Sequence, residues 1–137
     1  RDGKRLKEKF LSNTPSLRAL RERVSVASGR GYLHGLDRRR VSVRSEHAAL
    51  NTLLQSAGAI VMKKALCLLD EYAKLWNIDY KFVGNIHDEI QTEVREDQAV
   101  EFGRLAVSCI EAAGTHFNLN CPLAGEYKIG DNWSETH

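Results

Sequence analysis

Apolar residues recur at helical spacing in the first part of the chain. Residues 4–11 carry apolar side chains on one face and lysines on the other, which predicts a basic amphipathic helix. A second helix is expected to begin at Pro15, because proline fits the first helical turn and Thr14 can cap it. Gly29 and Gly31 should end this second helix.

The longest helical pattern begins at Ser45 and ends near Trp76. Ser45 is a good N-cap, and Glu46 in the first turn suits the helix dipole. The pattern predicts a helix of about 30 residues, well above the mean of roughly 11–12, with Gly58 as its one weak point. We expect such a helix to be the spine of a domain.

Two other stretches alternate polar and apolar positions with a period of two. Residues 32–44 predict a hairpin around Leu36 to Arg39. Residues 79–94 predict two strands around a tight connection at His87-Asp88-Glu89. Both hairpins are expected to be antiparallel.

The last third of the chain predicts one helix and one strand. The helix should start at Glu96-Asp97, and the strand should run from Tyr127 to Ile129. Gly130-Asp131-Asn132-Trp133 is expected to end the fold. Together the elements predict an α+β fold in which antiparallel strands pack on long α-helices.

Composition favours an ordinary globular domain. The 137 residues are 42% hydrophobic and 28% charged, and a chain of this length can bury a real core. No apolar run approaches the roughly 20 residues that span a bilayer, so we expect a cytoplasmic protein without a membrane partner. The spacing of Cys67, Cys109 and Cys121 favours neither disulfides nor a zinc site, and they are interpreted as small core residues.

Charge is distributed unevenly along the chain. Residues 1–45 hold 13 Lys/Arg and 4 Asp/Glu, whereas residues 46–137 hold 7 Lys/Arg and 14 Asp/Glu. A basic part joined to an acidic part suits a protein that grips a polyanion with one and holds metal cations with the other. Alternatively, the two parts neutralise each other within the fold.

His87-Asp88-Glu89 is the first candidate for chemistry. Two adjacent carboxylates at a hairpin tip repel each other unless a cation lies near them, which suggests a divalent metal. Magnesium needs few carboxylates besides water and phosphate oxygens, and such a tip supplies them. The alternative is a solvated turn, because acids are common in turns.

A polar ridge on the long helix is the second candidate. His47, Asn51 and Gln55 follow one another at intervals of four residues. The amides of Asn51 and Gln55 are neutral donors, which is what the acceptors of the DNA minor groove require. The alternative is that the ridge is the solvent-exposed face of the helix and binds no ligand.

Basic residues form the third candidate, a phosphate-binding surface. Four arginines flank the first predicted hairpin: Arg38, Arg39, Arg40 and Arg44. They could contact phosphates, although arginine clusters also serve solubility. The sequence contains no GxGxxG, GKS/T, GxSxG or HExxH motif.

Three motifs carry a resemblance to a known family. They are HAALNTLLQSAGA at 47–59, NIHDEI at 85–90 and GDNW at 130–133. Their order and spacing resemble family A DNA polymerases, most closely the phage replicative type. Two upstream stretches, KEKFLSNTPSLRALRE and LHGLDRRRVSVRS, resemble the segments that join fingers to palm in that group. The resemblance covers almost the whole chain. It implies a fingers remnant at 1–30 and the C-terminal part of the palm at 31–137.

The resemblance also implies roles for the hairpin tip. Asp88 matches the second metal-binding aspartate of the palm, and Glu89 matches the neighbouring acid of the same motif. His87 matches a histidine near the primer terminus. Metal ligation is therefore expected of Asp88 and Glu89, and catalysis of all three residues.

The other candidates find roles in DNA binding. Asn51 and Gln55 match palm-helix residues that face the minor groove of the primer–template, and His47 matches a position on the same face. The resemblance implies that the four arginines bind the DNA backbone.

The implied reaction is attack of a primer 3′-hydroxyl on the α-phosphate of a deoxynucleoside triphosphate, supported by two Mg²⁺ ions. Primer–template DNA and deoxynucleoside triphosphates are the expected partners. The family's first metal aspartate and its nucleotide-binding fingers helix match nothing in these residues. We therefore expect the chain to be part of a longer polymerase, to need its N-terminal remainder and to be inactive alone.

Two alternatives to an enzyme fragment remain open. A binding hypothesis interprets the chain as a stand-alone duplex-binding module, or as one half of a split polymerase, and the basic first part supports it. A structural domain without a nucleic-acid role would require the three motifs to be coincidental.

Overall fold

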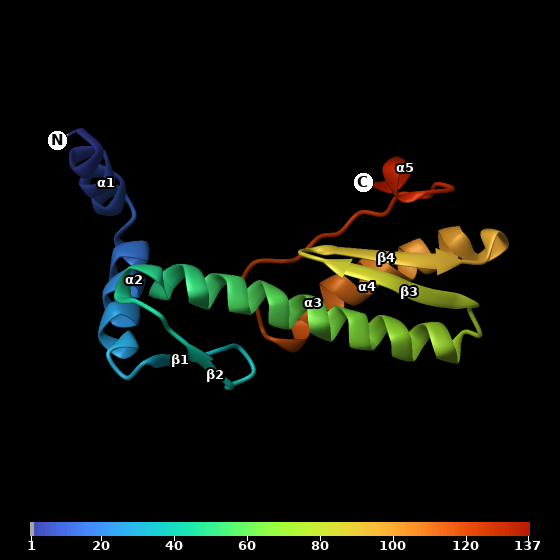
Figure 1. Ribbon diagram of the computed structural model, residues 1–137, viewed down its shortest axis with the longest axis horizontal. Coiled ribbons are helices and arrows are strands. Elements are labelled where there is room, and N and C mark those ends of the chain that lie inside the picture. The colour runs from blue at the N-terminus through green and yellow to red at the C-terminus, as the bar shows by residue number, and fades with distance from the viewer. Residues whose placement is uncertain (1) are drawn as a thin grey trace. The chain divides into compact units, whose positions relative to one another are not determined.

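The computed structural model describes residues 2–137, which divide into two compact units with the boundary between Ala57 and Gly58. Helix α3 (Ala49–Leu75) contributes to both units. The division falls at Gly58, the position that the sequence marks as the weak point of this helix. Figure 1 shows α3 as a continuous helix. The predicted division into fingers and palm at residue 30 stays a prediction.

The first unit contains two helices and a small hairpin. Its elements are α1 (Asp2–Asn13), α2 (Pro15–Ser28), β1 (Tyr32–His34), β2 (Arg40–Ser42), the 3-10 turn η1 (Glu46–Ala48) and the start of α3. Strands β1 and β2 are antiparallel, with Leu33 opposite Val41. Val24, Leu33 and Ala49 form the buried centre, which joins α2, β1 and α3. The predicted helices and hairpin of this unit are confirmed.

The predicted helix caps are wrong. The Thr14 hydroxyl donates to the carbonyl of Phe10, 2.8 Å away, and therefore caps nothing on α2. Ser45 makes no side-chain cap either, and the long helical segment opens with the 3-10 turn. Glu46, the first residue of this 3-10 turn, accepts a hydrogen bond from the hydroxyl of Ser25 in α2. Residue type alone made both caps plausible, but the Thr14 hydroxyl finds a competing acceptor on the preceding helix.

The second unit contains the other hairpin and its supporting helices. Its elements are the rest of α3, β3 (Tyr80–Ile86), β4 (Glu89–Val94), the 3-10 turn η2 (Glu96–Gln98), α4 (Ala99–His116) and α5 (Trp133–Thr136). Strands β3 and β4 are antiparallel, with Ile86 opposite Glu89. Val83 is the extra residue of a bulge between Phe82 and Gly84. This bulge breaks the alternation that the sequence predicts through β3.

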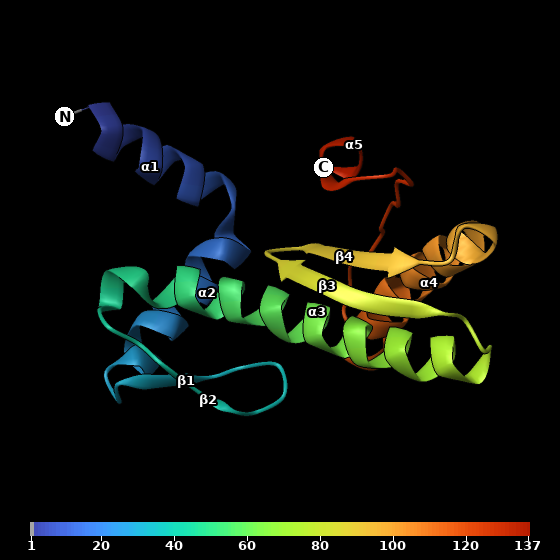
Figure 2. The same ribbon diagram turned by 45° about the vertical axis from the view of Figure 1, so that its right-hand side comes forward.

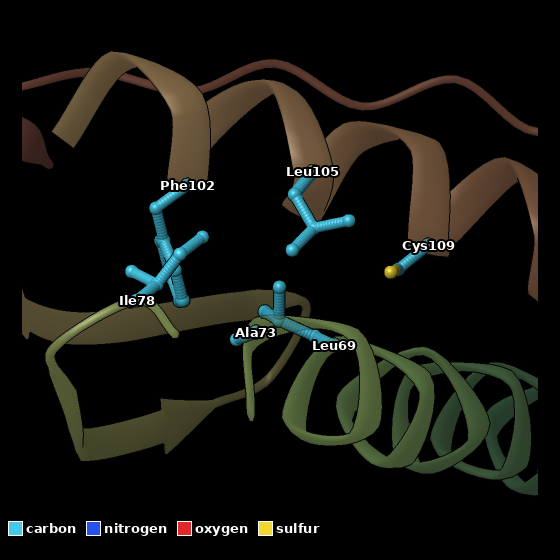
Figure 3. Close-up of a cluster of buried hydrophobic side chains, with 6 residues drawn as sticks. All are labelled: Leu69, Ala73, Ile78, Phe102, Leu105 and Cys109. Carbon is cyan, nitrogen blue, oxygen red and sulfur yellow. The ribbon is translucent and has the colours of Figure 1, made fainter. Parts of the chain in front are cut away.

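The hairpin of the second unit rests on a buried apolar cluster (Figure 3). Its members come from α3, α4 and the connection after α3: Leu69, Ala73, Ile78, Phe102, Leu105 and Cys109. Tyr80 of β3 lies against Phe102, with ring centroids 5.4 Å apart. Figure 2 shows the hairpin running alongside α4. The cluster therefore gives the β3–β4 hairpin a fixed support.

The predicted strand at Tyr127 to Ile129 is wrong. These residues pair with no strand within residues 2–137, and the segment that contains them lies against α4. A Cβ added to Gly103 would come within 2.3 Å of the Tyr127 ring, and one added to Gly114 within 2.9 Å of Leu123. The glycines thus let an extended segment approach the helix closely. The chain then ends its described part with α5, which the sequence did not predict.

One expectation from composition is wrong, and the expectation that the chain has no membrane partner stays a prediction. Cys109 is buried, but Cys67 and Cys121 are exposed, so only one of the three cysteines is a core residue. By length and composition alone, segment Glu46–Leu75 could cross a membrane, although it contains no unbroken apolar run of about 20 residues. This is a weak indication, because the same segment contributes to all three buried clusters, as the core helix of a soluble domain also does.

Candidate functional site: two hairpins of opposite charge

Asp88 lies in the two-residue turn that joins β3 to β4. The other turn residue, His87, has a φ of 56°, in the left-handed region where histidine is tolerated better than most residues. A two-residue hairpin loop needs a positive φ at its first or at both positions, so the turn forces this conformation on His87. The result is an exposed imidazole and an exposed carboxylate side by side at the tip.

The carboxylate of Asp88 is free to bind a cation. Within residues 2–137 it takes part in no hydrogen bond or ion pair, and no three acids, histidines or cysteines there gather into a metal site. A single free carboxylate at an open tip fits the chemistry of Mg²⁺, which takes one or two protein carboxylates and fills its other positions with water or phosphate. The tip therefore offers one exposed carboxylate whose chemistry suits a divalent cation.

The carboxylate of Glu89, the first residue of β4, forms hydrogen bonds with other side chains of the protein. Its Oε1 accepts hydrogen bonds from the amide of Gln91 and, at 3.0 Å, from the indole N–H of Trp133. Its Oε2 lies 2.9 Å from Nδ1 of His137. The bonds from Gln91 and His137 lower the pKa of Glu89, against the opposing effect of desolvation. The predicted second metal ligand thus binds the C-terminal segment in this structure.

The polar ridge of the long helix is exposed as predicted. His47 lies in η1, and Asn51 and Gln55 follow in the first turns of α3. None of the three side chains makes a hydrogen bond to another side chain within residues 2–137. They belong to the first unit, whereas the acidic tip belongs to the second. The ridge is therefore available to a ligand.

The arginines of the β1–β2 hairpin differ from one another. Arg39 is held by Asp37, with Nε 2.5 Å from Oδ2. Desolvation opposes ionisation of Asp37, but the hydrogen bonds and charge of Arg39 outweigh it and lower the pKa of this carboxyl group. Arg38 takes a φ of 67° in the turn, and Arg40 and Arg44 are exposed.

Two residues of this hairpin region were missed by the sequence analysis. The ring of Tyr32 has the guanidinium of Arg40 at 4.7 Å and that of Arg30 at 5.5 Å from its centroid. Arg40 pairs with His34 and is therefore a diagonal neighbour of Tyr32 across the hairpin. The signal was an aromatic residue in β1 with arginines before it and across from it.

Comparison with known proteins gives the family of the chain. Residues 4–135 match DNA polymerase family A. The chain is 40% identical to the DNA-directed DNA polymerase of Enterobacteria phage T3 and 38% identical to that of Escherichia phage T7, over 98% of its length in each case. It is 27% identical to DNA polymerase I of Pseudomonas aeruginosa over 95% of its length. The chain therefore belongs to DNA polymerase family A, as its motifs predicted.

The fold agrees with this membership. The structure resembles the POL domain of Pol1 from M. smegmatis, solved in complex with DNA primer-template and dNTP, with a TM-score of 0.74 over 82% of this chain. The two sequences are 22% identical, so this likeness concerns the fold alone. The chain spans 22% of the length of each of the T3 and T7 polymerases. The predicted α+β polymerase fold is confirmed.

Proposed function

We propose that the chain is the C-terminal part of a DNA-directed DNA polymerase that adds deoxynucleotides to a primer 3′-hydroxyl during DNA replication. The observation that carries the proposal is the free carboxylate of Asp88 at an exposed β-turn in a member of this family. Its relatives from phages T3 and T7 are named DNA-directed DNA polymerases, which supports the same activity here.

Asp88 would hold the divalent metal, for which we propose Mg²⁺ and two ions in the complete enzyme. Bound Mg²⁺ ions lower the pKa of the primer hydroxyl and neutralise charge on the triphosphate. Glu89 would join as a ligand only by exchanging one of its protein donors, so Asp88 is the principal ligand in this proposal. His87 would contact the primer terminus beside it.

His47, Asn51 and Gln55 would hold the primer–template in the minor groove. Each of Asn51 and Gln55 offers an amide N–H₂, and purine N3 and pyrimidine O2 are acceptors at similar places in every base pair. Such contacts sense the geometry of a pair without reading its identity. The exposure of the ridge and its lack of protein partners within residues 2–137 support this role.

The arginines of the first hairpin would bind the DNA backbone. Arg38, Arg40 and Arg44 are exposed, whereas Arg39 would first have to leave Asp37. Backbone contacts position a duplex without reading its sequence. They suit a polymerase, which must accept every template.

The chain would act within a larger polymerase. We propose that residues 1–30 belong to the fingers and residues 31–137 to the palm, and that an upstream part supplies another metal-binding carboxylate and most of the nucleotide site. The described residues gather no complete metal site, which supports the expectation that the chain alone is inactive. Its place would be the cytoplasm of a bacterial or phage-infected cell.

Primer extension by the complete polymerase tests the proposal. Asp88→Asn should reduce Mg²⁺-dependent extension by several orders of magnitude, because the metal contributes several kcal/mol to transition-state stabilisation. Glu93→Gln is the matched control, since Glu93 is an exposed acid of the same hairpin, and it should extend primers normally. Near-normal extension by Asp88→Asn would refute the proposal.

A second candidate is a duplex-binding module, or half of a split polymerase, and the basic composition of residues 1–45 favours it. The 137-residue chain alone should then bind duplex DNA with an affinity that falls steeply as salt rises. Extension restored by adding a separate N-terminal part would identify a split enzyme. Absence of duplex binding at low salt would exclude the module.

A further inference from the structure

The ring of Tyr32 organises two arginines on the surface of the first unit. The guanidinium carbons of Arg40 and Arg30 lie 4.7 and 5.5 Å from the ring centroid, within the range of a cation–π interaction. Arg30 follows α2, and Arg40 begins β2, so residues ten apart in sequence share one aromatic platform. We call Arg30, Tyr32 and Arg40 the tyrosine–arginine platform.

The platform keeps its positive charge available. Within residues 2–137 neither Arg30 nor Arg40 forms an ion pair, whereas the adjacent Arg39 is paired with Asp37. An aromatic ring attracts a guanidinium but leaves its N–H donors free. Arg40 can therefore stack on the ring and donate to an anion at the same time.

The hairpin loop beside the platform is tightly braced. The amide of Gly35 donates to the carbonyl of Arg39 at 2.9 Å, and the amide of Arg38 donates to the carbonyl of Gly35 at 2.9 Å. Nδ1 of His34 lies 3.0 Å from the carbonyl oxygen of Arg38. Tyr32 also contacts His34 edge to face, with ring centroids 5.5 Å apart. A fixed loop and a stacked side chain lower the entropy lost when a ligand binds.

We propose that the tyrosine–arginine platform is a phosphate-binding site that takes phosphodiester groups of a nucleic-acid backbone. Arg40 on the hairpin and Arg30 just before it are both exposed and form no ion pair within residues 2–137, although Nε of Arg30 donates to the carbonyl of Ala27 at 3.4 Å. Their remaining N–H donors suit a chain of phosphates, and arginine forms bidentate bonds to them. This inference rests on the proposed polymerase function, because it names the contact by which the first unit would hold the duplex. It adds Arg30 and Tyr32 to the DNA-binding residues.

Nucleotide triphosphate offers the same phosphate chemistry and is the alternative source. A triphosphate site normally includes carboxylates that hold its Mg²⁺. The acid of this hairpin, Asp37, is neutralised by Arg39, and the platform is open to solvent. The duplex backbone is therefore the better match.

Salt-dependent binding of a primer–template to the complete polymerase tests the site. Arg30→Ala and Arg40→Ala should each reduce the slope of log K against log salt by about 0.9 for every phosphate contact that is lost. Arg18→Ala removes the same charge from an exposed position of α2 outside the platform and should leave the slope almost unchanged. Equal slopes for all three variants would overturn the proposal.

Substitution of Tyr32 tests whether the ring aids duplex binding by holding the two guanidiniums in place, because it leaves the net charge unchanged. Tyr32→Phe keeps a ring under both guanidiniums and should bind the duplex normally, whereas Tyr32→Leu should weaken binding several-fold without any change in charge. Thermal unfolding of each variant checks that the hairpin still folds. Equal affinity of the folded Phe and Leu variants would show that the ring has no role in binding.

Two further readouts distinguish the possible failures. A rise in the KM for the nucleotide with an unchanged duplex Kd would assign the platform to the triphosphate and overturn the backbone site. Loss of extension in Asp88→Asn alongside an unchanged salt slope in the platform variants would refute the platform only. Normal extension in Asp88→Asn would instead refute the proposed polymerase function.

Discussion

The two hairpins of this protein share a design and differ in what their tips leave free. Each is a two-stranded antiparallel hairpin with one non-glycine turn residue in the left-handed region, Arg38 in β1–β2 and His87 in β3–β4. The β1–β2 hairpin presents arginines, one of which, Arg39, is paired with Asp37. The β3–β4 hairpin presents acids, one of which, Glu89, contacts Trp133 and His137. In both, one charged residue is tied to the protein and another stays free.

The comparison shows that two adjacent residues of like charge can serve different purposes, one contacting the protein and the other remaining exposed. Asp88 and Glu89 adjoin in sequence, yet Glu89 holds the C-terminal segment and Asp88 faces solvent. Arg39 and Arg40 adjoin as well, but Arg39 closes an ion pair within the loop and Arg40 stacks on Tyr32. In each of these two pairs, one charged side chain therefore stabilises the local structure and the other can still bind a ligand.

The largest expected effect is a kinetic separation of the two hairpins. In the complete polymerase, Asp88→Asn should lower kcat by at least about a thousandfold and leave the duplex Kd nearly unchanged, because the metal acts on the transition state. Arg40→Gln should weaken duplex binding and leave kcat at saturating duplex nearly unchanged. Single-turnover kinetics and equilibrium titration measure the two quantities. A loss of kcat in both variants would show that the hairpins are not functionally separate.

The support of the acidic hairpin should be sensitive to a single methyl group. Gly103→Ala should destabilise the protein by about 1–3 kcal/mol, because the new Cβ would collide with the Tyr127 ring. Gly58→Ala is the control on α3, where a Cβ meets nothing within 4 Å, and it should stabilise by about 0.5–1 kcal/mol. Urea unfolding followed by circular dichroism measures both changes. Equal and small effects would mean that the extended segment does not pack on α4.

Glu89 should matter for docking of the C-terminal segment. Glu89→Ala removes the acceptor of Trp133 and the partner of His137, which should weaken docking of this segment. Trp133 fluorescence in a Trp76→Phe background should shift to longer wavelength and become easier to quench with iodide. Glu93→Ala removes an exposed acid of the same strand and should leave the spectrum unchanged. An unshifted spectrum for Glu89→Ala would indicate that other contacts dock the segment.

The smallest effect is expected from the two turn residues. Glycine accepts a positive φ without strain, so His87→Gly and Arg38→Gly should raise stability by no more than about 1 kcal/mol. If His87 contacts the primer terminus, His87→Gly should also slow extension, whereas Arg38→Gly should affect only duplex affinity. Thermal unfolding and extension assays compare them. A loss of several kcal/mol from either would mean that its side chain supports the fold.

The sequence predicted most of the local structure. Helical spacing gave α1 to α4, and alternation gave both hairpins, because these patterns report directly which face of an element is buried. Alternation could not reveal the bulge at Val83, since an unpaired residue depends on the partner strand. It also predicted a strand at Tyr127 to Ile129, where the neighbour is a helix and supplies no pairing edge.

The candidate site was predicted less completely. Asp88 was predicted from two adjacent acids at a turn, and its exposure agrees with that hypothesis. The different positions of Asp88 and Glu89 could not be predicted, because they depend on Trp133 and His137, more than 40 residues away. Tyr32 was missed for a similar reason: only the register of the hairpin shows that Arg40 lies over its ring.

The contact between His137 and Glu89 bears on how the protein is handled. His137 places an imidazole beside the turn that carries Asp88, because its Nδ1 lies 2.9 Å from the carboxylate of Glu89. Further histidines engineered into this segment would thus bring competing imidazoles to the proposed magnesium ligand. Polyhistidine tags for activity measurements therefore belong away from this segment.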